Sequence, residues 1–547
     1  AQLVPLACTH FLIMVCTMTV FMAAIVSLAH AGDRSGTRLQ RQPLSGSAYW
    51  HLPARCMAGD VNALFQFRGV RHLMQQWGPN AVTCVGHAVS TDLLHWTRLP
   101  DALTPGTSGQ GCFDGSVTIL QRKGVPTPVM MSDGGCGLAN ASGGNLPCME
   151  FYGDGLTGGV IAFPENLSDP HLSAWTKEPL IFHGCNGSGG PSPIWQNGDA
   201  YELIAIHNEG EARFVATDES LLQWRMVDPN FIAVRGGGGG LWHELPQNVP
   251  GISGPRWPTH IFQSNAMFGD GVSAFVMGIY DKQTERFMNV SDARLVDVGT
   301  TVRYGELSAA SVGDNVGHDP RTLHVSWLTG VQPKDAKDCD TGGLLTSFRE
   351  LQFDPRLPPS GALVELPIAE YELLRGSLLF NVSGEKLDRE ASSLVMGTAG
   401  IAMDTELEVS PIASASWACE IGVRCESRAA CNRGARLTLT RSDSSEHGQT
   451  VAMSVQTPTE AQRTSFTLLA HETALGLRIM LDVTSVELFV AGGRGVFSGA
   501  LNGTGLLIAN CSGSDLEISG LAWEMGSIFP SKSTARGMSV AARNLWI

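Results

Sequence analysis

The sequence predicts an all-β protein built from a closed or radial sheet followed by a β-sandwich. The chain has 547 residues, which is too many for one ordinary compact core and indicates two domains. Its 63 glycines are typical of many short strands joined by tight turns. Short apolar or alternating runs recur along most of the chain, whereas long amphipathic helical patterns are scarce.

The strands of the first domain are predicted between Tyr49 and about Leu373. Leu64 to Phe67 turns at Arg68-Gly69 into Val70 to Gln76, which is the pattern of a β-hairpin. A closed or radial arrangement leaves few strand edges exposed, although periodicity alone does not give the number of blades. Further strand-like runs are Val117 to Gln121, Pro128 to Met131, Ala200 to His207, Ser273 to Tyr280 and Thr322 to Leu328.

The second domain is predicted to begin after Arg375-Gly376. Leu477 to Asp482 and Val486 to Val490 are strand-like, and Gly492-Gly493 turns the chain toward Val496-Phe497. This half has alternating strands and few clusters of aromatic or acidic residues, as a sandwich that supports its neighbour would have. We therefore expect the first domain over residues 48–375 and the sandwich over 376–547.

The first 31 residues differ from the rest, and a linker is expected at residues 32–47. Phe11 to Ala29 is almost uninterrupted apolar sequence, and Ala29-His30-Ala31 offers small residues at the two positions that a signal peptidase reads. A stretch of this length could instead remain in a bilayer as a signal-anchor. Both alternatives imply the secretory pathway, with the protein extracellular, in a cell wall or vacuole, or anchored through residues 11–29.

Sequons and cysteines favour the secretory pathway as well. Two of the 13 cysteines lie in the leader, so eleven follow it, an odd number that leaves at least one unpaired within the chain. Cys419, Cys425 and Cys431 are spaced too widely for a zinc knuckle, so we expect disulfides or buried thiols and no metal. Seven Asn-x-Ser/Thr sequons follow the leader, at Asn140, Asn166, Asn186, Asn289, Asn381, Asn502 and Asn510.

The charge of the chain excludes one class of partner. The net charge is −15, and the acidic residues are spread along the sequence rather than gathered in a tail. Such a chain repels phosphate backbones, so we expect no nucleic-acid partner.

Three segments of the first domain combine acidic, amide and aromatic residues in a recognisable order. They are Met57 to Ala63 followed by His72 to Gln76; Val85 to Trp96 followed by Leu99-Pro100 and Phe113 to Ser116; and Leu241 to Pro246. Together they resemble glycoside hydrolase family 32, the invertases, inulinases and related fructosyltransferases. The resemblance extends over roughly residues 48 to 525 through Ile161 to Pro170, Ser347 to Leu351, and Asp482, Ser485, Glu487 and Phe489.

The resemblance implies a five-bladed β-propeller with a funnel-shaped active site at its axis, followed by a β-sandwich. It implies retaining hydrolysis of a terminal β-fructosyl bond of sucrose or a fructan, without a cofactor, by two carboxyl groups about 5–5.5 Å apart. By position, Asp60 matches the nucleophile, which must be ionised, and Glu244 matches the acid/base, which must hold a proton. The remaining contacts to the fructosyl group would be Asn62, Gln76, Asp114 and Ser116.

Each of these residues also has a structural interpretation. Asp60 could cap a turn, and Glu244 follows the flexible run Gly236 to Gly240, where a surface glutamate is ordinary. We expect His87 to be a structural hydrogen-bonding residue, and Trp96 and Trp327 to belong to the core rather than to a sugar platform.

One family motif is broken. The family's third carboxylate lies in an Arg-Asp-Pro segment, but the matching residues here are Gly189, Gly190 and Pro191. Loss of a contact that strengthens in the transition state can cost several kcal/mol, so slow turnover is expected unless Asp114 or Asp133 compensates. Two interpretations therefore stay open: an active β-fructofuranosidase or fructosyltransferase, and a pseudo-enzyme that binds a fructoside or glycan. Met57, Gly59 and Leu245 are further departures from the family pattern.

Overall fold

The computed structural model describes residues 49–528 except for a set of connecting segments. These are 55–59, 78–83, 105–113, 134–155, 184–189, 208–209, 233–240, 245–257, 266–271, 290, 296, 308–318, 320, 332–342, 358–361, 387–393, 411, 413–416, 446–447 and 513–515. The predicted leader, the linker, the glycine run before Leu241 and the sequons at Asn140 and Asn186 lie outside the described residues. Within the described ranges, no helix has the length and apolar character needed to cross a membrane.

The strands of the first part form five groups. The first group is β2 (Val61–Phe67), β3 (Val70–Trp77), β4 (Cys84–Ser90) and β5 (Thr97–Arg98). The second is β6 (Gly115–Arg122), β7 (Val125–Asp133), β8 (Leu156–Pro164) and β9 (Trp175–His183), and the third is β10 (Trp195–Asn197), β11 (Ala200–His207), β12 (Gly210–Ala216) and β13 (Gln223–Ile232). The fourth is β14 (Leu241–Glu244), β15 (His260–Ser264), β16 (Ala274–Asp281), β17 (Arg286–Asn289) and β18 (Arg294–Leu295). The fifth is β19 (Val302–Leu307), β20 (Thr322–Thr329), β21 (Gly343–Leu345), β22 (Arg349–Phe353) and β23 (Leu363–Pro367), with β1 (Pro53–Ala54) added at its edge.

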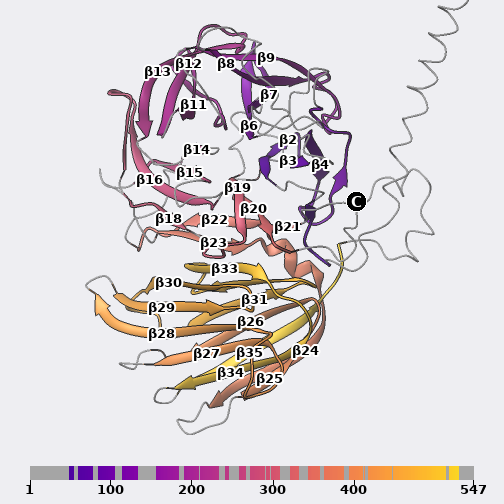
Figure 1. Cartoon of the computed structure of the whole chain (residues 1–547), viewed down its shortest axis with the longest axis vertical. Helices are drawn as coiled ribbons and strands as arrows, with labels where there is room; N and C mark the ends of the chain where they lie inside the picture. The colour runs from indigo at the N-terminus through magenta and orange to yellow at the C-terminus, as the bar shows by residue number, and fades with distance from the viewer. Residues whose placement is uncertain are drawn as a thin grey trace, which may run out of the picture. The chain divides into compact units, whose positions relative to one another are not determined.

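These groups are the five blades of a β-propeller, as the resemblance implied. Each is an antiparallel sheet, and the second and third join into one sheet where β13 pairs in parallel with β9. Figure 1 shows the first strands β2, β6, β14 and β19 around a common centre. Apolar side chains of neighbouring blades pack together, for example Phe65 and Met74 of the first blade with Val117 and Ile119 of the second.

The β2–β3 hairpin confirms the predicted turn. Arg68 and Gly69 have φ values of +49° and +79°, so both lie in the left-handed region that two-residue turns between twisted strands require. The hairpin returns Gln76 to the start of β2, where its backbone N–H donates to the Asp60 carbonyl at 2.8 Å. The turn therefore fixes which residue of β3 lies beside Asp60.

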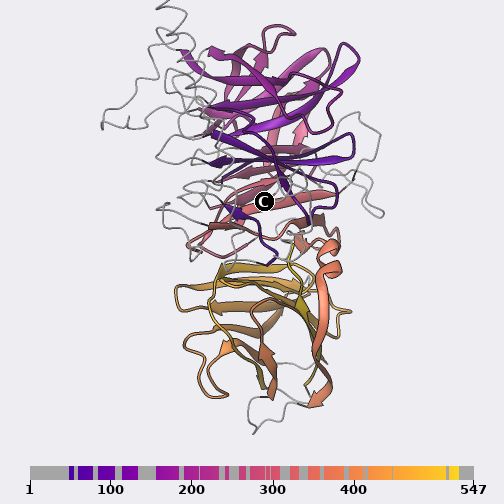
Figure 2. The same ribbon diagram turned by 90° about the vertical axis from the view of Figure 1, so that its right-hand side faces the viewer.

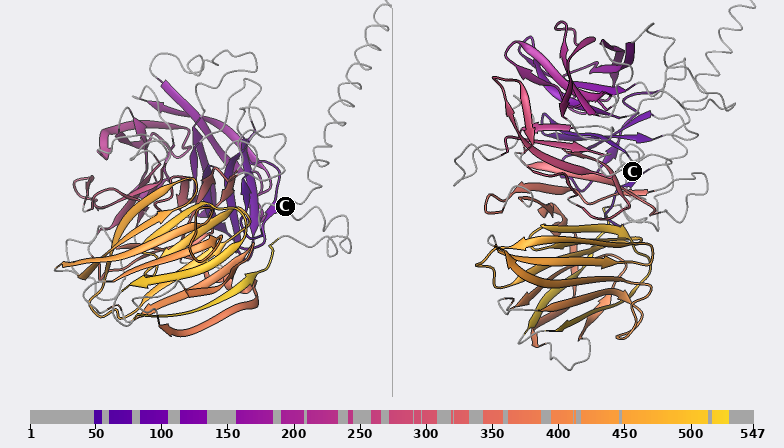
Figure 3. Two further views of the ribbon diagram at one scale, coloured as in Figure 1. Left: turned by 60° about the horizontal axis from the view of Figure 1, so that its bottom comes forward. Right: turned by 60° about the vertical axis from the view of Figure 1, so that its left-hand side comes forward.

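A short 3₁₀ helix (Ala369–Leu374) precedes two six-stranded sheets that form a β-sandwich. One sheet has the order β24 (Arg375–Lys386), β35 (Glu517–Met525), β26 (Met403–Ser410), β31 (Leu475–Leu481), β32 (Ser485–Val490) and β33 (Gly495–Ala500). The other has the order β25 (Leu394–Ala399), β34 (Gly505–Ser512), β27 (Ala418–Cys425), β28 (Ala435–Ser445), β29 (Gly448–Gln456) and β30 (Ala461–Leu468). Figures 2 and 3 show these sheets from other directions.

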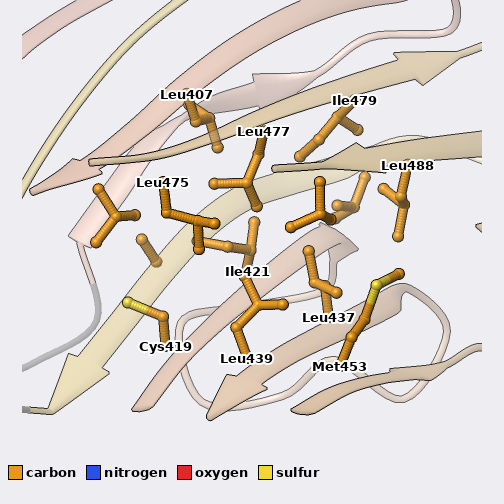
Figure 4. Close-up of a cluster of buried hydrophobic side chains, with 14 of the residues drawn as sticks. Leu407, Cys419, Ile421, Leu437, Leu439, Met453, Leu475, Leu477, Ile479 and Leu488 are labelled. Carbon is orange, nitrogen blue, oxygen red and sulfur yellow. The ribbon is translucent and has the colours of Figure 1, made fainter. Parts of the chain in front are cut away.

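The core of the sandwich comes from both sheets. Leu407, Leu477 and Leu488 of one sheet pack against Ile421 and Leu437 of the other, and all are buried (Figure 4). Alternation of apolar and polar residues along strands such as β26 contributes to this inner face, whereas β32 is buried along its whole length. Two disulfides complete the second sheet, Cys419–Cys511 and Cys425–Cys431, so the three cysteines that the sequence analysis singled out all form disulfides.

A buried polar network joins residues of the propeller strands to residues of the sandwich strands. The Arg349 guanidinium forms ion pairs with Asp297 at 2.8 Å, with Glu365 at 2.9 Å and with Glu487 at 2.9 Å. His51 lies 2.8 Å from Glu487, through Nε2. Arg349 and Glu487 both belong to segments that resemble the family, and the fold brings them together.

Candidate active site

Two aspartates lie at the starts of the first strands of two neighbouring blades. Asp60 immediately precedes β2, and Asp114 immediately precedes β6. Gln76 connects the two: its backbone pairs with Asp60, and its side-chain Nε2 donates to Asp114 Oδ1 at 2.8 Å. Gln76 is itself buried, so the contact is shielded from water. The structure thus brings together three of the predicted site residues, which come from two blades.

The surroundings of both carboxyl groups oppose ionisation. Burial is the largest cause of the raised pKa of Asp60, and the negative charge of Asp114 raises it further. Burial also raises the pKa of Asp114, but the hydrogen bond from Gln76 acts in the opposite direction. Asp60 Oδ1 is buried and has no hydrogen-bond partner among the residues that the structure describes. Asp114 is therefore the better stabilised anion, and Asp60 more readily holds a proton.

Asn62 and Ser116 each follow one of these aspartates by two residues. Asn62 lies in β2 at a register shift between Val61 and Ala63, where the ladder with β3 is interrupted. Such bulges occur beside active sites because they re-aim a side chain. Ser116 lies in β6 opposite Met131. Both side chains are buried, and each lies in the first strand of its blade.

Glu244 is the last residue of β14, and its backbone is in register with His260 of β15. The structure describes this backbone but not the Glu244 side chain. The predicted separation of the Asp60 and Glu244 carboxyl groups therefore stays a prediction. No set of three or more His, Cys, Asp or Glu side chains in the described ranges could hold a metal ion.

The model of the glycosyl hydrolases family 32 N-terminal domain matches residues 51–360, more than half of the chain. The chain belongs to glycoside hydrolase family 32. A fructan 1-exohydrolase of Bromus pictus is 26% identical over 518 residues, which cover 82% of this chain and 80% of the relative. An insoluble isoenzyme of beta-fructofuranosidase from Arabidopsis thaliana is 25% identical over 415 residues, covering 69% and 66%.

Solved structures of the family share the fold. The crystal structure of fructan 1-exohydrolase IIa from Cichorium intybus matches with a TM-score of 0.67 at 18% identity, covering 88% of this chain and 97% of that chain.

For some relatives the sequence match is shorter. A fructan 1-exohydrolase from Aegilops tauschii is 28% identical over 367 residues, which cover 60% of this chain and 55% of the relative.

The segment predicted to match the family's Arg-Asp-Pro motif lies between β9 and β10. Gly190 is buried and has a φ of +50°, while Gly189 lies outside the described residues. After Gly190, the backbone N–H of Ser192 donates to the Ile204 carbonyl at 2.8 Å. The N–H of Ile194 donates to Thr118 Oγ1 of β6 at 2.7 Å. The segment after Gly190 is thus attached to β6, the strand that Asp114 precedes.

The other predictions for single residues concern packing. His87 Nε2 of β4 lies 2.9 Å from His72 Nδ1 of β3, in the first blade. Burial lowers the pKa of His72 and lowers that of His87 to about 3, so this pair is neutral and structural. Trp96 is buried, stacks on Phe348 and donates to the Leu93 carbonyl at 2.9 Å, as a core residue does. Trp327 is half-buried in β20.

The sequence analysis did not single out Glu211 of β12. Its side chain is buried, and neither carboxyl oxygen has a hydrogen-bond partner among the described residues. Burial alone raises the pKa of Glu211 to about 8. The sequence offers one signal for this burial: Glu211 begins the run to Val215, whose apolar residues indicate a buried strand.

Proposed function

We propose that the protein is a retaining β-fructosidase that releases terminal β-fructosyl units from sucrose or fructans, with Asp60 as nucleophile and Glu244 as acid/base. The observation that carries the proposal is the pair of half-buried carboxyl groups, Asp60 and Asp114, linked by Gln76 at the starts of the first strands of two blades. Relatives named fructan 1-exohydrolase and beta-fructofuranosidase support the fructosyl specificity.

The reaction proceeds in two displacements. An Asp60 carboxylate oxygen forms a bond to the anomeric carbon of the fructosyl group while the glycosidic bond breaks, and Glu244 donates its proton to the leaving oxygen. Glu244 then takes a proton from water as that water attacks the same carbon and releases Asp60. Activity requires ionised Asp60 and protonated Glu244, so the pH–rate profile is bell-shaped.

A direct assay tests this proposal. Purified protein is incubated with sucrose, 1-kestose and inulin, and released fructose is measured for the wild type, Asp60→Asn and Glu244→Gln. We expect release by the wild type and loss of nearly all turnover in both variants, each of which should keep its unfolding temperature or exceed it. Wild-type activity that survives Asp60→Asn would show that another residue is the nucleophile.

The second candidate function is binding without turnover. The observation that favours it is Gly190, where the family carries a carboxylate. In that case, calorimetry detects a fructoside that the protein binds, while no fructose is released over days. Fructosyl transfer is distinguished by its products, since longer oligosaccharides accumulate at high sucrose concentration.

Passage through the secretory pathway is part of the proposal. The side chains of the five sequon asparagines in the described ranges are exposed, at Asn166, Asn289, Asn381, Asn502 and Asn510. An accessible asparagine is the requirement for N-glycosylation. Protein expressed in a eukaryotic host should therefore lose mass on treatment with an N-glycosidase. The choice between a cleaved leader and an anchor is tested by extraction of membranes with carbonate.

A further inference from the structure

Asp114 stands next to the proposed nucleophile but has no role in the two displacements. Its Oδ1 accepts a hydrogen bond from the buried Gln76 side chain, which holds the carboxyl group in one orientation. The Gln76 backbone N–H donates to the Asp60 carbonyl, so Gln76 contacts both aspartates. The Asp114 carboxyl group therefore contacts the same residue that adjoins the proposed nucleophile, and after burial its charge is the second cause of the raised pKa of Asp60.

In the part of the chain that the structure describes, no cationic side chain offsets the negative charge at this position. Among the described residues, no lysine or arginine contributes to the pKa of either Asp60 or Asp114. The imidazoles of His72 and His87, in β3 and β4 of the same blade as Gln76, are neutral, because burial lowers the pKa of both. Such a site disfavours a second anion and favours a ligand that develops positive charge. The transition state of fructosyl transfer is of this kind, since it has oxocarbenium character.

The segment of Gly190, the position that matches the family's third carboxylate, is attached to the strand that Asp114 precedes. Gly190 has no side chain to offer, and its segment is attached through Ile194 to Thr118 of β6, the strand that Asp114 precedes. The Gly190 segment thus offers no carboxylate, whereas the start of β6, to which this segment is attached, carries Asp114.

We propose that Asp114 supplies the transition-state charge that is absent at Gly190, and that Gln76 positions it. The inference rests on the proposed hydrolysis. Ionised Asp114 stabilises the positive charge on the fructosyl ring during both displacements, when Asp60 forms and then loses its bond. The compensation is electrostatic and requires no proton transfer by Asp114.

The first test compares Asp114→Asn with the wild type. Asparagine has the same shape and can still accept from Gln76, so only the charge is lost. We expect kcat for fructose release to fall by about 10²–10³. The acid limb of the kcat/KM profile should move to lower pH, because the neighbouring charge no longer raises the pKa of Asp60. A purely structural role of Asp114 would not move that limb.

Asp218→Asn is the matched control. Asp218 is an exposed carboxylate that accepts from the Ser220 N–H in the turn after β12, and its removal should leave kcat and the pH profile unchanged. If Asp114→Asn does not fold, Asp114→Glu replaces it. That variant keeps the charge but moves it by one methylene, and we expect a smaller fall in kcat with the acid limb near its wild-type position.

Reciprocal rescue is the second test. Gly190→Asp introduced into Asp114→Asn should raise kcat by about tenfold or more, because a carboxylate returns on the neighbouring element. Gly190→Asn in the same background has the same size and also tolerates the left-handed backbone, so it should give no rise. In the wild type, Gly190→Asp should bring little gain, since the charge is already present.

A ligand that mimics the charge provides a readout apart from turnover. A pyrrolidine iminosugar with the fructofuranose hydroxyl groups carries a protonated ring nitrogen, and calorimetry compares its Kd with that of fructose. Asp114→Asn should weaken binding of the iminosugar more than binding of fructose. The inference about Asp114 is overturned, without affecting the proposed hydrolysis, if Asp114→Asn keeps the wild-type kcat. It is also overturned if kcat falls but the acid limb does not move and Gly190→Asp gives no rescue. A wild type that releases no fructose overturns the proposed function as well.

Discussion

At the level of single residues, the proposed site holds two carboxyl groups in surroundings that oppose their ionisation. Burial and mutual repulsion raise the pKa of Asp60, and burial raises the pKa of Asp114. A catalytic group with a shifted pKa commonly reduces the stability of the protein that holds it. The repulsion between the two carboxyl groups should therefore lower the free energy of unfolding, and removal of one charge should raise it.

Asp60→Asn should stabilise the protein near neutral pH, by about 0.5–2 kcal/mol. The folded-state pKa of Asp60 lies above the ordinary value of 3.8, so the stability that its protonated form contributes is lost as pH rises through the folded-state pKa. Thermal unfolding of wild type and variant over a pH series measures the difference, which should vanish below the ordinary pKa. In Asp218→Asn no stabilisation is expected, because hydrogen bonds from Ser220 lower the pKa of Asp218.

Glu211→Gln should remove part of the pH dependence of stability. The pKa of Glu211 rises from its ordinary value of 4.5 to about 8. The folded protein therefore holds a proton that the unfolded chain has lost between these values, and stability falls by up to about 1.4 kcal/mol per pH unit across that window. The melting temperature of Glu211→Gln should decline less than that of the wild type across the same window. Parallel curves for the two proteins would mean that Glu211 ionises normally.

At the level of elements, the disulfides fix strands of one sheet of the sandwich. Cys419 of β27 and Cys511 of β34 face each other in register, and they are 92 residues apart in sequence. Cys425 and Cys431 are separated by only 6 residues. A crosslink stabilises mainly by restricting the unfolded chain, and this restriction grows with the length of the closed loop.

Removal of the long-range disulfide should therefore cost more than removal of the short one. We expect Cys419→Ala with Cys511→Ala to lower the free energy of unfolding by about 2–4 kcal/mol, and Cys425→Ala with Cys431→Ala to lower it less. Denaturant titration of the two double variants gives the comparison. Equal losses would indicate that the packing of the buried sulfurs, rather than loop closure, carries the stabilisation.

At the level of the whole molecule, the Arg349 network joins strands that are distant in the chain. Glu487 Oε1 accepts from the Ser347 N–H at 2.6 Å, and Glu487 Oε2 pairs with Arg349. Despite complete burial, the charges of Arg349 and His51 lower the pKa of Glu487 to about 2. Burial acts to lower the pKa of His51, but the hydrogen bonds of His51 with Asp482 and Glu487 raise it above its ordinary value. Each charge in the network is thus compensated by others.

Glu487→Gln should destabilise the protein by about 3–5 kcal/mol near pH 6, because it leaves Arg349 with one buried anion fewer. The pKa of Glu487 is lowered, so its stabilisation is present above 4.5 and is lost as pH falls toward about 2. Chemical unfolding at several pH values should show the difference between variant and wild type shrinking over that range. Glu420→Gln, at a partly exposed glutamate of β27 that pairs with Arg436, is the control and should have little effect.

Much of the architecture could be predicted because its signals are local. Period-two runs and paired turn residues are read from a few neighbouring positions, and the β2–β3 hairpin formed where Arg68-Gly69 indicated. The motif around Asp60 and the run from Val85 to Trp96 indicate the family by their residues alone. The domain boundaries and the pairing of Asp60 with Glu244 stay predictions.

The sequence by itself thus determined the all-β class, the strands and the candidate carboxylates. Only the tertiary structure decided which of these residues meet. Gln76 reaches Asp114 across 38 positions, Arg349 reaches Glu487 across 138, and Cys419 bonds to Cys511 across 92. Glu211 looks ordinary in the sequence, and only packing shows that its oxygens are buried without a partner among the described residues. Burial and charge act through space, so a pKa or an ion pair depends on contacts that no local pattern contains.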